Sequence, residues 1–262
     1  MIKVNINKKK FEIEKGSTVA HAIEKSVHKS KYPTLGAFLN NELVDLGDKL
    51  KRDCKIVPID IKSPSGLRIY STSLYFVMVA AAKKLFPKDT LMVQHSLSGG
   101  LFMEFKKRKL LSFKDIEDLK REARKIIKAD KPIKKETVDI EEAIEYFKSL
   151  GQTDKMSLFK NVYSDSVTLY SLNGEKAFFY GPLVLSTGVL KTFDLRYYPG
   201  GMLLLFPNGS SPDKVPPFRE QKKIFEVFHE FEDWQNVLNV CDVGSLNKTV
   251  MNGKISQLIK IS

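Results

Sequence analysis

The sequence predicts an α+β protein, because helical and strand patterns intermix along the chain without the strand–helix–strand rhythm of a parallel α/β sheet. Three observations carry this prediction. Residues 2–62 show a strand hairpin, one helix and further short strands. Residues 67–105 show a long apolar helix and then a second hairpin, and residues 113–238 mix amphipathic helices with further hairpins.

The first part of the chain has the element order of a β-grasp domain. Residues 2–6 and 11–13 alternate apolar and polar side chains around a lysine-rich turn, which indicates a hairpin. Gly16-Ser17-Thr18 then caps a helix whose apolar period runs to Val27. Short strands follow at 36–39, 42–44 and 55–59. A hairpin, one helix and several short strands in this order are the β-grasp arrangement.

A strongly apolar stretch from Leu67 to Phe105 organises the rest of the chain. Its helix ends at Lys83, Lys84 and Pro87, with cations at the negative end and then a residue that cannot continue it. The apolar run is too short and too closely followed by charge to span a membrane. The preceding Ser63-Pro64-Ser65-Gly66 has the composition of a joint between domains.

The remaining elements follow from caps, turns and periodicity. Ser112 caps a predicted helix over 113–129, and Asp139 with Glu142 has the spacing of a capping box for a helix through Leu150. Asn173-Gly174 suits the type I′ turn of a hairpin. Strands are expected at 190–198 and 202–206, a long helix at 218–238, and two short helices after 242. The aromatic stripe of the long helix is typical of a core or a domain interface.

Composition narrows the classes of function. The formal net charge of +12 favours nucleic acid, phosphorylated ligands or an anionic surface as partners, although the lysines are scattered among glutamates, as in proteins that work hot. The distant Cys54 and Cys241 suit a reducing cytoplasm and exclude a cysteine-built zinc site. The charged, alternating amino terminus is unlike a secretory signal, so we expect a cytoplasmic protein without membrane contact.

The order of several motifs resembles the amino-terminal half of bacterial threonyl-tRNA synthetases, over roughly residues 1–206. The motifs are NNELVDLGDKL, GLRIYSTSLYFVMVAAAKKLFP, the hairpin at Gly100, FKDIEDLKREARKII, DIEEAIEYFKSLGQTDKMSLF and YGPLV. The resemblance implies a β-grasp domain of the TGS class followed by an α+β editing-like domain. In that family the editing domain removes the wrong amino acid from tRNA.

The side chains that perform editing in that family are replaced in this chain. The family has His-x-x-x-His on the central helix and Cys-x-Gly-Pro-His on a later hairpin. The matching positions are Thr72 and Phe76 on the helix, with Phe179 and Leu183 flanking Gly181 and Pro182. Threonine, phenylalanine and leucine supply neither the metal ligand or proton acceptor of imidazole nor the nucleophile of thiolate. We therefore expect no catalytic residue, cofactor or metal here, and aromatic side chains that fill the former pocket.

A second resemblance covers essentially the whole chain. Some bacterial uridine kinase-like nucleoside kinases carry the same TGS and editing-like regions, and a helical connector similar to residues 218–262, ahead of their kinase domain. This resemblance implies ATP and Mg²⁺ for a kinase domain that this chain lacks, since it has no G-x-x-x-x-G-K-[ST] phosphate loop. The uncapped pattern QLIKIS at the end favours continuation beyond Ser262. The expected parts are 1–62, 63–216 and 217–262.

Three hypotheses of function remain open on these grounds. The leading one is a non-catalytic regulatory or substrate-presenting region of a uridine kinase-related protein, whose partners would be its kinase domain and a nucleoside or nucleotide. The alternative is a tRNA- or RNA-binding module, favoured by the basic charge and the synthetase-like motifs. The third is a hydrolase with a rebuilt site, in which His95, beside Ser96 and Ser98, faces the old pocket alongside Tyr180.

Overall fold

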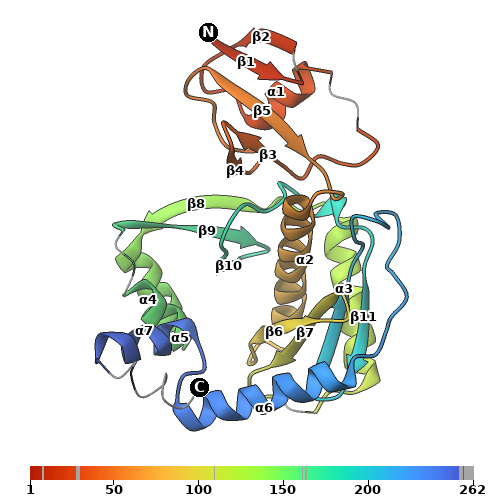
Figure 1. The fold of residues 1–262 in the computed structure, drawn as a ribbon, viewed down its shortest axis with the longest axis vertical. Helices are drawn as coiled ribbons and strands as arrows, with labels where there is room; N and C mark the ends of the chain where they lie inside the picture. Colours follow the sequence, from red (N-terminus) through yellow and green to blue (C-terminus); the bar gives the residue numbers. More distant parts are fainter. Residues whose placement is uncertain are drawn as a thin grey trace. The chain divides into compact units, whose positions relative to one another are not determined.

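The computed structural model describes residues 1–7, 9–27, 30–108, 110–160, 162, 164–253 and 256. The predicted α+β class is confirmed, with three sheets and several helices (Figure 1). The chain divides into two compact units. The first is made of Met1–Lys134 and Tyr170–Arg219, and the second of Lys135–Leu169 and the chain from Glu220 onward. No helix in the described part of the chain is long and apolar enough to cross a membrane.

The amino-terminal part of the first unit is the predicted β-grasp arrangement. Its sheet has the order β2-β1-β5-β3-β4, in which β1 and β5 pair in parallel. The elements are β1 (Ile2–Ile6), β2 (Lys9–Ile13), α1 (Val19–Lys25), β3 (Gly36–Leu39), β4 (Glu42–Val44) and β5 (Cys54–Ile59). Thr18 caps α1 by accepting a hydrogen bond from the backbone N–H of His21. The helix ends two residues before the predicted Val27, which has a positive φ of 55° and an exposed side chain.

The central helix α2 (Pro64–Leu85) begins earlier than the sequence indicates. Ser63 is its N-cap, and the Ser63 hydroxyl accepts a hydrogen bond from Gly66 N–H at 3.0 Å. Pro64 occupies the first turn, where its missing N–H costs no helical hydrogen bond. Gly66 is required there because a Cβ would lie 1.8 Å from the carbonyl oxygen of Asp60. The segment predicted as a joint between domains thus forms the N-cap and first turn of α2.

Helix α2 packs against α3 (Phe113–Lys128), beside a four-stranded sheet (Figure 1). The sheet order is β11-β12-β7-β6, from strands β6 (Leu91–Leu97), β7 (Gly100–Phe105), β11 (Asp194–Tyr198) and β12 (Gly201–Leu205). All five residues of β12 are buried, because it lies between β11 and β7. The strand predicted from residue 190 begins only at Asp194. Before it comes the short 3₁₀ turn η1 (Thr187–Val189), and Leu190 and Phe193 pack into the core.

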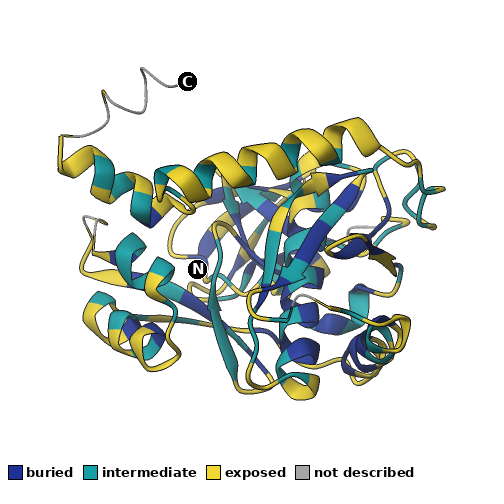
Figure 2. Cartoon of the chain, turned by 90° about the horizontal axis from the view of Figure 1, so that it is seen from below, coloured by how far each residue is buried: buried dark blue, intermediate teal, exposed yellow. Residues whose placement is uncertain are grey.

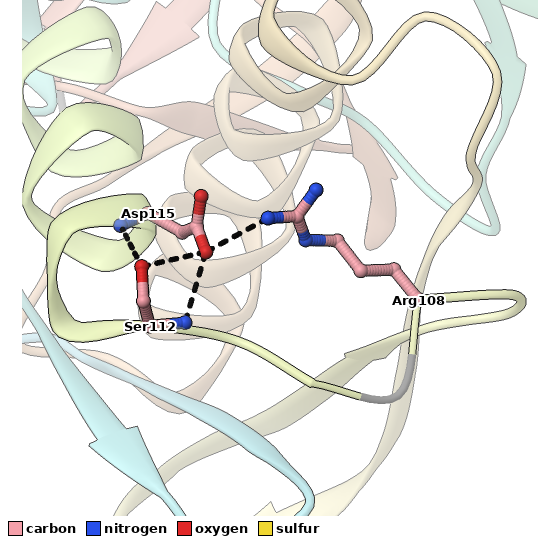
Figure 3. A network of polar contacts seen from close by, with 3 residues as sticks. All are labelled: Arg108, Ser112 and Asp115. Atoms are coloured by element: carbon pink, nitrogen blue, oxygen red, sulfur yellow. Dashed lines mark hydrogen bonds and ion pairs between the residues drawn. The ribbon is translucent and has the colours of Figure 1, made fainter.

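The start of α3 is fixed by a capping box that also binds an arginine (Figure 3). The Ser112 hydroxyl accepts from Asp115 N–H at 3.1 Å, and the Asp115 carboxylate accepts from Ser112 N–H at 2.9 Å. Arg108 Nη2 lies 2.9 Å from the same carboxylate. Burial opposes ionisation of Asp115, but the hydrogen bonds from Ser112 and Arg108 hold its pKa below the usual range.

A three-stranded sheet with the order β10-β9-β8 follows in sequence. Its strands are β8 (Lys134–Asp139), β9 (Ser166–Leu172) and β10 (Glu175–Phe178). Asn173 and Gly174 both have positive φ, 52° and 88°, as the type I′ turn between β9 and β10 requires. The predicted hairpin is therefore present. The chain passes from the second unit to the first within β9.

The second unit is mainly helical. Its helices are α4 (Ile140–Ser149), α5 (Thr153–Phe159), α6 (Lys222–Leu238) and α7 (Val243–Met251). Asp139 stands at the N-cap of α4 but makes no side-chain cap hydrogen bond, so the predicted capping box is absent. The second short helix predicted near the carboxyl end falls largely outside the described residues.

Two helices of this unit differ from the sequence prediction. Helix α5 was not predicted, and its Phe159 packs on Phe147 of α4, with 5.6 Å between ring centroids. Helix α6 begins four residues later than predicted, and no residue in it is fully buried (Figure 2). Phe231 and Trp234 in its aromatic stripe are more than half exposed, so this stripe is not core.

Candidate functional site

The positions that match the editing motif lie on α2 and on the segment after β10, and aromatic rings fill the space between them. Phe76 is fully buried, and its ring centroid lies 5.2 Å from that of Phe179 in an edge-on arrangement. Phe179 also contacts Tyr75 at 6.1 Å and Tyr170 at 6.4 Å. Thr72 is half-buried, one turn earlier on α2. Such a cluster contributes packing energy, and its members carry no group that donates or accepts a proton near neutral pH.

The segment that follows Phe179 is anchored to the core by hydrogen bonds. The buried Ser73 hydroxyl donates to Ile69 C=O at 2.7 Å and accepts from Val184 N–H at 3.0 Å. Tyr170 donates its hydroxyl to Gly181 C=O at 3.3 Å. Pro182 and Leu183 are buried in this turn, and Leu183 belongs to the same core cluster as Phe76. The turn holds apolar side chains against α2.

The other two residues predicted near the pocket, His95 and Tyr180, contact aromatic rings outside the Phe76–Phe179 cluster. His95 is on β6, half-buried, with its ring stacked on Phe102 of β7 at 5.1 Å. Tyr180 is 74% exposed and contacts Phe178 edge-on at 4.8 Å. Ser98 donates its hydroxyl to Arg219 C=O at 2.6 Å. In the described part of the chain, no three or more His, Cys, Asp or Glu residues are grouped as metal ligands.

A cleft of about 670 Å³ lies elsewhere in the first unit, between the carboxyl-terminal half of α3 and the loop around η1. We call it the basic cleft. Its lining residues are Arg124, Ile127, Lys128, Asp130, Ser186, Gly188, Val189, Lys191 and Phe193. Three of the four charged side chains are cations, and all four are exposed. The cleft therefore presents positive charge to solvent over an apolar floor.

The cations of α3 fall into two groups. Several are neutralised by neighbouring carboxylates: Lys120 lies 2.6 Å from Asp194, Arg121 pairs with Asp118, and Lys125 lies 3.7 Å from Glu122. By contrast, no carboxylate among the described residues lies within ion-pair distance of Arg124 or Lys128. Their spacing of four residues places them on one helix face. The charge of Arg124 and Lys128 is therefore available to a ligand.

The loop on the other side of the cleft is held firmly. The buried Thr187 hydroxyl donates to Ile126 C=O at 3.0 Å and accepts from Lys131 N–H at 2.9 Å. Asp130 accepts a hydrogen bond from Gly188 N–H at 2.7 Å. A side-chain hydrogen bond from Ser186, this backbone N–H and the charge of Lys191 hold the pKa of Asp130 below its usual range, although slight desolvation opposes them. Asp130 thus remains a carboxylate engaged with the loop.

The sequence analysis did not identify the basic cleft. In residues 120–131, KREARKIIKADK, lysines and arginines stand among acidic residues, and the sequence does not show which of these cations are paired. The only available signal was the spacing of Arg124 and Lys128, together with Lys191 far along the chain. Recognising the site required the fold that brings residues 186–193 to the end of α3.

Comparison with known proteins finds similarity to threonine–tRNA ligases. No protein-family model matches the chain. It is 30% identical over 204 residues to the threonine–tRNA ligase of Desulfovibrio desulfuricans, covering 76% of this chain and 32% of that protein. It is 31% identical over 185 residues to the threonine–tRNA ligase of Symbiobacterium thermophilum, covering 70% and 28%. For that of Francisella tularensis subsp. novicida the identity is 26% over 182 residues. The chain thus spans about a third or less of these relatives and is similar to one part of threonine–tRNA ligases.

Proposed function

We propose that this chain is an RNA-binding module whose ligand is tRNA, and that its former editing pocket is not catalytic. The similarity to threonine–tRNA ligases carries the proposal, because it extends over most of the chain. The net charge of +12 supports it, since phosphate contacts by Lys and Arg supply much of the affinity for nucleic acids. These relatives favour the RNA-binding alternative over the kinase-linked interpretation.

The aromatic cluster supports the non-catalytic part of the proposal. Phe76, Phe179 and Leu183 stand where the family's imidazole and thiol groups would be expected, and Phe76 and Leu183 are buried in the core. A hydrolytic step needs a positioned base or a metal-bound water, and these apolar groups provide neither. No cofactor is needed for a binding role of this kind.

A binding assay with labelled tRNA tests the RNA-binding part. At about 50 mM salt we expect saturable binding that weakens steeply as salt rises toward about 200 mM. A double-stranded DNA of similar length is the comparison ligand, and weaker binding to it than to tRNA is expected if RNA shape contributes to recognition. Lack of tRNA binding at the lower salt concentration would refute the proposal.

A deacylation assay tests the non-catalytic part. The chain is incubated with mischarged tRNA, and release of the amino acid is compared with the rate in buffer alone. We expect equal rates. Release above the buffer rate that is lost in a His95→Ala variant would instead support the rebuilt hydrolase.

A further inference from the structure

The basic cleft has the charge, shape and rigidity of a site for a phosphate ester. We propose that Arg124 and Lys128 bind a phosphate group there, and, resting on the proposed function, that this phosphate belongs to the backbone of the bound tRNA. The shared chemistry also fits a free nucleotide phosphate, and the experiment below separates the two sources.

The cations of α3 differ in whether they have a carboxylate partner. Arg121 and Lys125 have the same residue types and the same spacing as Arg124 and Lys128, but each has a carboxylate partner. A paired cation must give up its partner before it binds phosphate, whereas an unpaired one loses only hydration. Arg124 and Lys128, which have no such partner among the described residues, both line the cleft. Arginine is suited to this contact, because its planar guanidinium binds phosphate through two hydrogen bonds.

The walls of the basic cleft are held in place before any ligand binds. The Arg124 guanidinium carbon lies 5.8 Å from the ring centroid of Phe193, so the aromatic face limits the positions of the arginine head. The opposite wall is fixed by the buried Thr187, which bonds to residues on both sides of the end of α3. Gly188 lets the loop lie close to the Asp130 carboxylate, because a Cβ there would lie 2.4 Å from Asp130 Oδ1. A ligand would therefore enter a largely formed site, which lowers the entropy cost of binding.

The single carboxylate of the cleft does not cancel its positive charge. Asp130 accepts hydrogen bonds from the loop, and its charge faces Lys191. The hydrogen bonds hold Asp130 against the loop and, together with the charge of Lys191, lower its pKa. Arg124 and Lys128 remain as two charges without an internal partner. Two such charges suit a phosphodiester, which carries one negative charge, or a phosphomonoester with nearly two.

The basic cleft has an apolar floor. Ile127 and Phe193 are buried beneath the charged rim, and Val189 is half-buried beside them. A volume of about 670 Å³ is within the range of small-molecule sites. The combination of a charged rim and an apolar floor suits a nucleotide, whose phosphate would lie at the rim with its sugar or base against the floor. It suits a bare inorganic anion less well, since that would leave the floor in contact with water.

The test uses two double variants on the same helix. Arg124→Gln with Lys128→Gln removes the unpaired cations, and Arg121→Gln with Lys125→Gln removes the same residue types at the same spacing from the paired group. Both variants lose the same net charge. Thermal unfolding confirms that each variant is folded, and the affinity for labelled tRNA is measured from about 50 to 200 mM salt.

We expect the cleft variant to lose about tenfold or more in tRNA affinity and to reduce the slope of log affinity against log salt by roughly 1, because the one lost phosphate contact removes about 0.9. The control variant should change the slope by less than half as much. If tRNA binds but both variants weaken it equally, the cleft site is refuted and the proposed function stands.

Adenosine 5′-monophosphate, titrated in a thermal-shift assay, distinguishes the sources of phosphate. If tRNA fails to bind but the nucleotide stabilises the wild-type chain and not the cleft variant, the proposed function fails and the phosphate site stands, with a free nucleotide as its ligand. If neither ligand binds the wild-type chain, both the site and the function are refuted.

Discussion

Phe179 and Tyr180 are adjacent in the sequence but lie in opposite environments. The Phe179 ring contacts three other aromatic rings, whereas Tyr180 is 74% exposed. The resemblance predicts that Phe179 matches a catalytic position of the synthetases, and its contacts show a ring packed among three other aromatic rings.

Phe179→Ala should lower the free energy of unfolding by about 3 kcal/mol, because it removes ring contacts and leaves a cavity. Tyr180→Ala is the matched control, and it should change the same quantity by about 0.5 kcal/mol or less. Urea denaturation of both variants measures the difference. Equal effects of the two substitutions would contradict the assignment of Phe179 to the core.

Tyr70 offers a pH-dependent test of the α2 core. Burial raises the pKa of its hydroxyl to about 12, although a hydrogen bond to Thr192 C=O opposes the shift. The folded chain thus keeps a proton that the unfolded chain releases near pH 10, so the contribution of this group to stability is present below pH 10 and lost as pH rises toward 12.

The difference in free energy of unfolding between the wild-type chain and Tyr70→Phe should therefore become smaller as pH rises. Near pH 8 the variant should be less stable by about 1–3 kcal/mol, because the phenol bonds both backbone groups of Thr192. Between pH 10 and 12 the wild-type chain should lose that advantage, since ionisation of Tyr70 favours unfolding. A constant difference across this range, measured by urea denaturation, would contradict the burial of Tyr70.

Helix α3 has a structural role at its first turn and a proposed binding role at its last turns. Its first turn is used for folding, through the capping box of Ser112 and Asp115 with Arg108 (Figure 3). Its last turns carry Arg124 and Lys128 into the basic cleft. Substitutions at the two ends should therefore change different properties of the protein.

Ser112→Ala should lower the free energy of unfolding by about 1 kcal/mol, because it leaves a helical N–H without its capping acceptor. The tRNA affinity of the folded variant should be unchanged. Denaturation and tRNA titration of the same preparation measure both quantities. A loss of tRNA affinity without a loss of stability would contradict this division of roles along α3.

Some of the helices and turns could be predicted from the sequence, and others could not. Caps and turns identified α3 and the hairpin at Asn173-Gly174, because their signals are local. Helix α5 was missed, since its Gln152 N-cap makes no side-chain cap hydrogen bond. The start of α2 was predicted three residues too late, because Ser63-Pro64-Ser65-Gly66 suits a joint between domains as well as a helix start. The basic cleft depends on which cations are paired, and that is a property of tertiary structure.

For the whole molecule, the way the net charge of +12 is distributed decides which cations can bind a ligand. Three of the six Lys and Arg residues of α3 pair with carboxylates, which leaves the other three without such a partner among the described residues. The division of the chain into parts at 1–62, 63–216 and 217–262 remains a prediction, as does a link to a kinase domain with ATP and Mg²⁺. The binding of tRNA can be measured on this chain alone.

The salt dependence of tRNA binding tests the central claim most directly. A chain that binds tRNA through a few phosphate contacts should show log affinity falling linearly with log salt, with a slope of roughly −2 to −4. Saturable binding with such a slope is the predicted result. Absence of binding at about 50 mM salt, or an affinity that does not change with salt, would contradict the claim that this basic chain recognises RNA through its phosphates.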